Sequence, residues 1–229
     1  MKTTLICTIL SGLILQLVAA GPVPKPLEMF PGKSDLEAAV YPLGWANNGT
    51  HIALLIAQPN EAADERNWEV VITDLASDKV VFTKAIQYPA EAGFARFWSE
   101  HGNAVEAACR EQGVERVAMR VHPFPALLGR NGQDIYEAHL GTHWKEEPNF
   151  LYDGINKLEL KLSNEGKEKT ILEKSWPQWF PLSASLVGYI PNPEGTRIAV
   201  LLSLVERGYE GPPHTRHVLI TGSRVGERF

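Results

Sequence analysis

The sequence predicts a mainly β (α+β) fold, built of propeller-like antiparallel β-meanders with one amphipathic helix. Three observations support this prediction. Short segments rich in β-branched and aromatic residues alternate with turn sequences along most of the chain. Residues 90–112 instead place apolar side chains three or four positions apart, which is the period of a helix. A hairpin-like pattern occurs twice, near residues 44–55 and near residues 188–201.

Residues 1–20 have the features of a secretory signal peptide. Lys2 gives a positive start, an apolar run follows, and Val18-Ala19-Ala20 supplies the small residues at which signal peptidase cuts. The apolar run is too short for a membrane span, and prolines follow it at once. We therefore expect a periplasmic or secreted protein with no integral membrane segment after cleavage.

Two regions follow the predicted cleavage site. Residues 21–38 form a Pro-rich leader, and the composition of residues 21–31 predicts poor order. Residues 39–229 are predicted to form a single β-rich globular domain. Within it, two related meanders at about 39–88 and 155–222 are expected to be joined by the helix.

The first meander is indicated by four β-rich segments and the turns between them. Asn47-Asn48-Gly49 is a strong turn signal, and residues 74–79 have the composition of a hairpin connection. The four predicted strands are Tyr41–Trp45, His51–Ala57, Trp68–Thr73 and Val80–Ile86.

The helix predicted over about residues 90–112 ends at Gly113, a usual C-terminal stop. Cys109 lies on its apolar face, so we expect this thiol to be buried and inert. Cys7 would leave with the signal peptide, so no intramolecular disulfide is expected. The helical face consists of Phe94, Phe97, Trp98, His101, Val105, Ala108, Cys109 and Gln112.

Strand signals return after the helix. Asn164-Glu165-Gly166 has the composition of a tight hairpin turn. The predicted strands are Arg116–Val121, Gln133–Leu140, Leu158–Leu162, Thr170–Lys174, Ala184–Ile190, Arg197–Leu204 and His217–Thr221.

The repeated pattern consists of a glycine, an aromatic residue, a turn that ends in Gly-Thr, and an apolar strand. The first copy starts at Gly44-Trp45 and the second at Gly188-Tyr189. This order is typical of hairpins in β-propeller blades. The two copies are too far apart to be consecutive blades, so we interpret them as the starts of two related meanders. Whether they share one sheet is left open.

Three stretches carry a resemblance to a known family. They are Leu43–Asp74, the helix that ends at Gly113, and Arg207–Pro212 leading into Val218–Gly222. On these residues the chain resembles a bacterial family of predicted secreted proteins of unknown function, with propeller-like (TolB-like) β-hairpin motifs. The resemblance implies secretion and a β-rich fold. It brings no assigned activity and no catalytic residues.

Two segments are candidate binding sites. The loop Gly208, Tyr209, Glu210 and Gly211 could display its two central side chains, or could be a structural turn. The segment with Trp176 and Trp179 could form an exposed aromatic platform, although large aromatic side chains more often cover a core.

His139 and His143 are the candidate metal ligands. They are four residues apart, and Glu146 and Glu147 follow closely. Spacing of this kind suits a metal only if the segment is helical, and Gly141 makes an exposed loop the simpler interpretation. No Walker loop, nucleophile elbow or His-Glu-x-x-His sequence is present, and we expect no cofactor.

Charge bears on the class of partner. The chain has 22 basic and 27 acidic residues and no Lys/Arg cluster, which argues against nucleic acid as a partner.

The leading hypothesis is an exported, soluble, non-catalytic binding protein of the bacterial envelope, whose partner is an envelope protein or polymer. The alternatives are an envelope hydrolase, metal-assisted through His139 and His143, and a purely structural subunit. The oligomeric state is left open.

Overall fold

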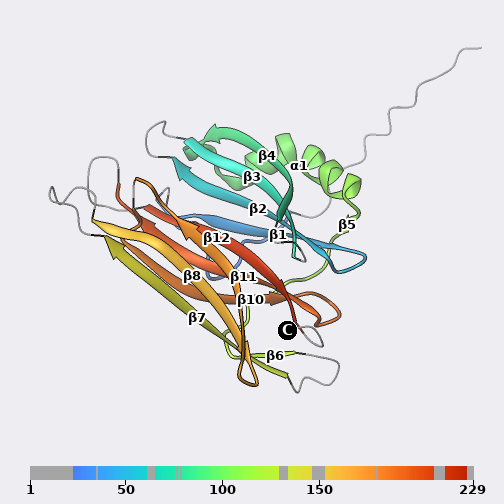
Figure 1. Cartoon of the computed structure of the whole chain (residues 1–229). Helices are drawn as coiled ribbons and strands as arrows, with labels where there is room; N and C mark the ends of the chain where they lie inside the picture. The colour runs from blue at the N-terminus through green and yellow to red at the C-terminus, as the bar shows by residue number, and fades with distance from the viewer. Residues whose placement is uncertain are drawn as a thin grey trace, which may run out of the picture.

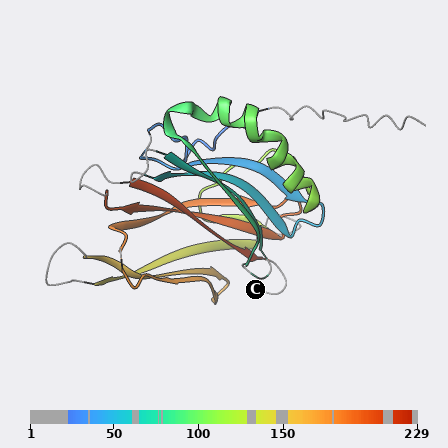
Figure 2. The ribbon, with the colours of Figure 1, turned by 90° about the horizontal axis from the view of Figure 1, so that it is seen from above.

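In the part of the chain that the structure describes, three antiparallel sheets lie one above another, and one α-helix covers the outer face of the first sheet (Figures 1 and 2). The structure is a computed structural model. The mainly β fold with one helix confirms the predicted fold class. The residues that the structure describes are 23–34, 36–60, 65–75, 77, 79–128, 134–145, 153–178, 180–208 and 215–225.

The first sheet contains the predicted four-stranded meander and one added strand. A short fifth strand, β5, pairs with the free side of β1, so the order is β4-β3-β2-β1-β5. The predicted turns follow β1 and β3. Strands β1 and β2 are buried along most of their length, whereas buried and half-buried residues alternate along most of β3. The strands are β1 (Ala39–Ala46), β2 (His51–Asn60), β3 (Glu65–Asp74), β4 (Lys79–Pro89) and β5 (Val114–Glu115).

The helix lies where its period predicted it. A 3-10 turn, η2 (Ala90–Ala92), leads into α1 (Gly93–Glu111), and Gly113 follows with a φ of +66°. The apolar face of α1 packs on the first sheet, where Phe97 stacks on Trp68 of β3 with ring centroids 4.2 Å apart. The apolar face of the helix is therefore buried against the sheet, as expected for an amphipathic helix.

The strands after the helix form two sheets, so the predicted second meander is divided between them. The hairpin at Glu165-Gly166 is present, with positive φ at both residues as a two-residue type I′ turn requires. The third sheet has β6 (Ala126–Leu128), β7 (Asp134–Lys145), β8 (Gly154–Asn164) and β9 (Lys167–Ser175), and the middle sheet has β10 (Ser183–Pro191), β11 (Arg197–Glu206) and β12 (Thr215–Arg224).

The middle sheet is buried on both faces. Along β11, Ala199 and Leu201 face the first sheet, whereas Val200 and Leu202 face the third. This two-sided burial explains why residues 198–202 are a continuous apolar run rather than an alternating one. Within the described part of the chain, no helix is both long and apolar enough to cross a bilayer.

The Pro-rich leader is part of the folded core, so the expectation of poor order is wrong for its described residues. The Leu27 amide donates to the Val40 carbonyl at 2.7 Å, and the Val40 amide donates to the Phe30 carbonyl at 3.1 Å. The Ala38 amide donates to the Arg216 carbonyl at 2.7 Å. Leu27 and Phe30 are buried in the core between the first and middle sheets. The leader therefore lies along the boundary between the two sheets.

The two copies of the repeated pattern occupy different sheets, β1–β2 and β10–β11. In each, the strand register shifts at the glycine, and the φ values of Gly44 and Gly188 are +154° and +152°. A Cβ at Gly44 would overlap the Glu115 carbonyl, and one at Gly188 would overlap the His122 carbonyl. Residues 114–122, which we call the connector, therefore pass directly over both glycines.

Candidate functional site: a groove beside the connector

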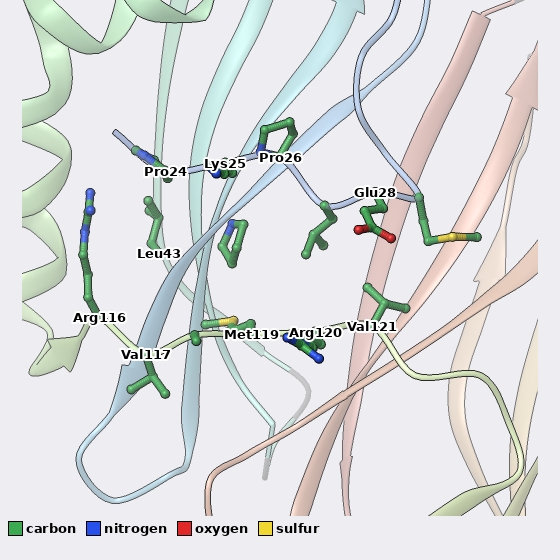
Figure 3. Close-up of a pocket in the computed structure, with 14 residues that line it drawn as sticks. Pro24, Lys25, Pro26, Glu28, Leu43, Arg116, Val117, Met119, Arg120 and Val121 are labelled. Carbon is green, nitrogen blue, oxygen red and sulfur yellow. The ribbon is translucent and has the colours of Figure 1, made fainter. Parts of the chain in front are cut away.

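A groove of about 740 Å³ lies between the leader and the connector (Figure 3). Leader residues 24–29 form one wall and connector residues 116–121 form the other. Pro42 and Leu43 of β1 line the space between them. Its size is within the range usual for ligand sites.

The groove exists because two neighbours share the free edge of β1. The connector pairs with β1 only at Trp45 and Ala46, through Glu115 and Val114. The leader bonds to β1 at Val40. Between these contacts the leader and connector leave the strand in different directions, so the part of the edge at residues 42–43 lies between the two walls.

The connector wall is an extended stretch of backbone that lies outside the sheets. Its two ends are fixed: Glu115 pairs with β1, and His122 exchanges two backbone hydrogen bonds with Tyr189 of β10, at 2.8 and 2.9 Å. Among the described residues, no backbone hydrogen bond to residues 117–121 is found. Those of their amides and carbonyls that face the groove can therefore pair with the backbone of a ligand.

Most of the residues that line the groove have apolar side chains. Met119 and Val121 pack against the core between the first and middle sheets, so their positions are fixed. Val117 and Met29 are 42% and 47% exposed, which leaves apolar surface for a ligand. The other apolar residues of the lining are Pro24, Pro26, Leu27, Pro42, Leu43 and Ala118.

The charged residues of the groove are mainly basic. Lys25, Arg116 and Arg120 line it, against one acid, Glu28. Arg116 is already bound to Glu106 of α1 at 3.0 Å. The chain as a whole carries a formal charge of −5, so the local balance is opposite to the global one. A groove of this kind suits an extended ligand that brings negative charge.

Trp176 and Arg207, the residue before the candidate loop, each bond to the backbone near the start of β8. The Trp176 amide donates to the Asn156 carbonyl at 2.9 Å, and the Arg207 guanidinium donates to the Asp153 carbonyl at 2.8 Å. Trp176 is half-buried against the core between the middle and third sheets, and Gly208 is buried. The remaining candidates, Tyr209, Glu210, Gly211 and Trp179, lie outside the described residues.

His139 and His143 lie on strand β7 rather than on a helix or a loop. Four residues along a strand correspond to roughly 13 Å, which is too far for both rings to bind one ion. Their cross-strand neighbours on β8 are Lys161 and Lys157, whose charge opposes a cation. Within the described residues no group of three or more His, Cys, Asp or Glu side chains could hold a metal; Glu146 and Glu147 lie outside them.

Cys109 is buried on the inner face of α1, as predicted. Burial raises the pKa of its thiol to about 11, and the nearby Arg116 lowers that pKa only in part. At neutral pH the thiol is therefore protonated, which makes it a poor nucleophile.

Comparison of the chain with protein-family models, curated proteins and solved structures finds no match. The groove is therefore interpreted from its own geometry. Sequence reasoning did not single out its residues. The signal that could have found them is the alternation of Val117, Met119 and Val121, which gives the predicted strand at 116–121 one apolar face.

Proposed function

We propose that the chain is an exported, non-catalytic binding protein of the bacterial envelope. The observation that carries this proposal is the groove between the leader and the connector. It combines an apolar lining, free backbone groups and a basic rim, which are features of a recognition site.

The leader's position fits an exported protein. The groove wall begins at Pro24, three positions after the predicted mature start at Gly21. Removal of the signal peptide would therefore leave one wall of the groove at the mature N-terminus. An attached signal peptide would continue from this wall.

The hydrolase alternative has less support from the geometry. Its metal-assisted form needs His139 and His143 on a single ion, and β7 holds them roughly 13 Å apart. The groove, by contrast, is formed entirely by described residues, and its walls are held by backbone hydrogen bonds at several points.

The test is a cross-linked pull-down of residues 21–229 from the cell envelope, read by mass spectrometry. We compare the natural chain with Arg120→Glu, which reverses a charge in the groove, and with Lys84→Glu, a matched reversal on the exposed strand β4. We expect one dominant partner, retained by Lys84→Glu and reduced at least tenfold by Arg120→Glu.

Two results would contradict the proposal. Equal recovery with Arg120→Glu would remove the groove as the binding site. If neither the natural chain nor Lys84→Glu recovers a partner above background, the proposal of an envelope-binding protein fails.

A further inference from the structure

We propose that the groove binds an extended polypeptide segment, which adds to the connector as a β-strand and carries acidic residues at its ends. This inference rests on the proposed binding function and names its ligand class. It follows from three properties of the groove: free backbone groups, an apolar lining with alternating side chains, and basic charge.

The backbone of the connector has the properties of an acceptor strand. Residues 116–121 contain no turn or bend, and residues 117–121 make no backbone hydrogen bond to another described residue. An extended peptide alongside them would satisfy these groups, as in β-strand addition to a sheet edge. Five residues at about 3.3 Å each give a contact of roughly 16 Å, which defines a short linear segment.

The acceptor strand is held in its extended form before any ligand binds. Its ends are tied to β1 and β10, and the glycines Gly44 and Gly188 allow its carbonyls to lie close to both sheets. Met119 and Val121 anchor it to the core. Because the strand is already ordered, binding avoids much of the entropy cost of fixing a flexible loop.

The side chains of the groove define what the peptide should contain. Successive side chains of a strand point to opposite faces, so a bound peptide would direct alternate residues toward Pro42, Leu43 and the leader. Those positions favour apolar residues. Lys25 and Arg120 are exposed at the groove and no ion pair to another described residue is found for either, so they favour acidic flanks.

The experiment starts from a phage-displayed library of random heptapeptides selected on residues 21–229. We expect enrichment of sequences with alternating apolar residues and with Asp or Glu near the ends. A synthetic copy of the enriched heptapeptide then serves as the probe, with its affinity measured by fluorescence anisotropy.

Proline variants test the backbone mechanism. Val117→Pro and Ala118→Pro each remove one N–H, and successive N–H groups of a strand point to opposite sides, so one of the two removes a donor that faces the peptide. We expect at least one to weaken binding tenfold or more. Lys84→Glu, which changes an exposed side chain on β4 outside the groove, is the control and should bind as the natural chain does. Thermal melting monitored by circular dichroism confirms that each variant is folded.

Hydrogen exchange supplies a readout that does not depend on a variant. The amides of residues 117–121 should exchange rapidly in the free protein, because the described structure gives them no backbone partner, and should become protected when the heptapeptide is added. Protection confined to another part of the chain would overturn the inference.

The possible failures can be told apart. If no heptapeptide is enriched, or both proline variants bind it normally, the polypeptide inference is wrong. The envelope-binding proposal would still stand if Arg120→Glu abolishes capture of an envelope polymer. If the heptapeptide binds as expected but the envelope yields no partner, the polypeptide inference stands and the proposed envelope function fails.

Discussion

The hairpins β1–β2 and β10–β11 share a local motif but differ in their surroundings. Each has a bulge at a glycine that lies against a connector carbonyl, and each ends in a turn with a positive-φ glycine, Gly49 or Gly195. The outer face of the first hairpin's sheet is covered by α1, whereas that of the second is covered by the third sheet (Figure 2). The motif therefore determines the bulge and turn of each hairpin and where the connector passes. It does not determine which element covers each sheet.

The two turns differ in one further respect. Asn48 is exposed, and its Oδ1 accepts hydrogen bonds only within its own turn, from Thr50. Asn192 is buried; its Oδ1 accepts from the Thr196 and Arg197 amides, and its Nδ2 donates to the Gly49 carbonyl of the other hairpin at 3.2 Å. The second turn thus stabilises both hairpins, whereas the first stabilises its own.

The largest expected effect comes from the shared glycines. Gly44→Ala and Gly188→Ala should each lower the free energy of unfolding by about 3 kcal/mol or more, because the new Cβ overlaps connector backbone and the φ values disfavour alanine. The overlap is larger at Gly44, so its loss should be larger. Urea unfolding measures both.

Gly141→Ala is the matched control for these two variants. Gly141 lies in the middle of β7, its nearest new contact would be an ordinary 3.8 Å, and its φ is not positive. Its unfolding free energy should change by less than about 1 kcal/mol. Equal losses in all three variants would show that the connector does not depend on the two glycines.

A smaller effect should separate the two turns. Asn192→Ala should cost about 2 kcal/mol of unfolding free energy, because it leaves two half-buried backbone amides and the buried Gly49 carbonyl without this partner. Asn48→Ala should cost below about 1 kcal/mol, since water can replace its exposed bonds. Urea unfolding measures both losses. Similar losses for Asn192→Ala and Asn48→Ala would refute the proposal that only the second turn stabilises both hairpins.

The smallest effect concerns the helix that covers the first sheet. Because burial raises the pKa of Cys109 to about 11, the thiol stays neutral in the folded chain while it ionises at a lower pH in the unfolded chain. Its contribution to stability is complete below the unfolded pKa and is lost as the pH rises toward 11. The urea midpoint should therefore fall over this range less steeply in Cys109→Ala than in the natural chain.

Aromatic disulfide reagents give a direct check on the same thiol. Cys109 should react slowly at pH 8 in the folded chain and rapidly in denaturant. Fast reaction of the folded chain would mean that α1 does not stay packed on the first sheet. The helix and the third sheet would then differ in mobility as well as in structure.

Local pattern was sufficient to predict the helix and the hairpins. The helical period of residues 90–112 and turns such as Asn164-Glu165-Gly166 are properties of neighbouring residues, and the structure has both. The leader was predicted wrongly because its prolines indicate poor order locally, whereas Leu27 and Phe30 are held by contacts with residues far along the chain. The division of the second meander into two sheets is also a matter of long-range packing.

The groove could be predicted only in part. Residues 116–121 were expected to be a strand, and they are extended, but whether a strand finds a partner depends on where other segments end. Pro42, the leader and the connector meet because β5 stops after two residues. The histidine spacing was misleading for a related reason, since four residues share a face at close range only on a helix.

The hydrogen bonds between Ala38 and Arg216, and between Arg216 and Leu36, also bear on the order of folding. Ala38 and Arg216 are 216 − 38 = 178 residues apart. These bonds therefore cannot form until nearly the whole chain has been synthesised or translocated. A chain that emerges N-terminus first, from a ribosome or a translocation channel, cannot complete the burial of Leu27 and Phe30 until the later strands follow. Contacts of this range predict slow folding and a period in which a chaperone can protect the leader.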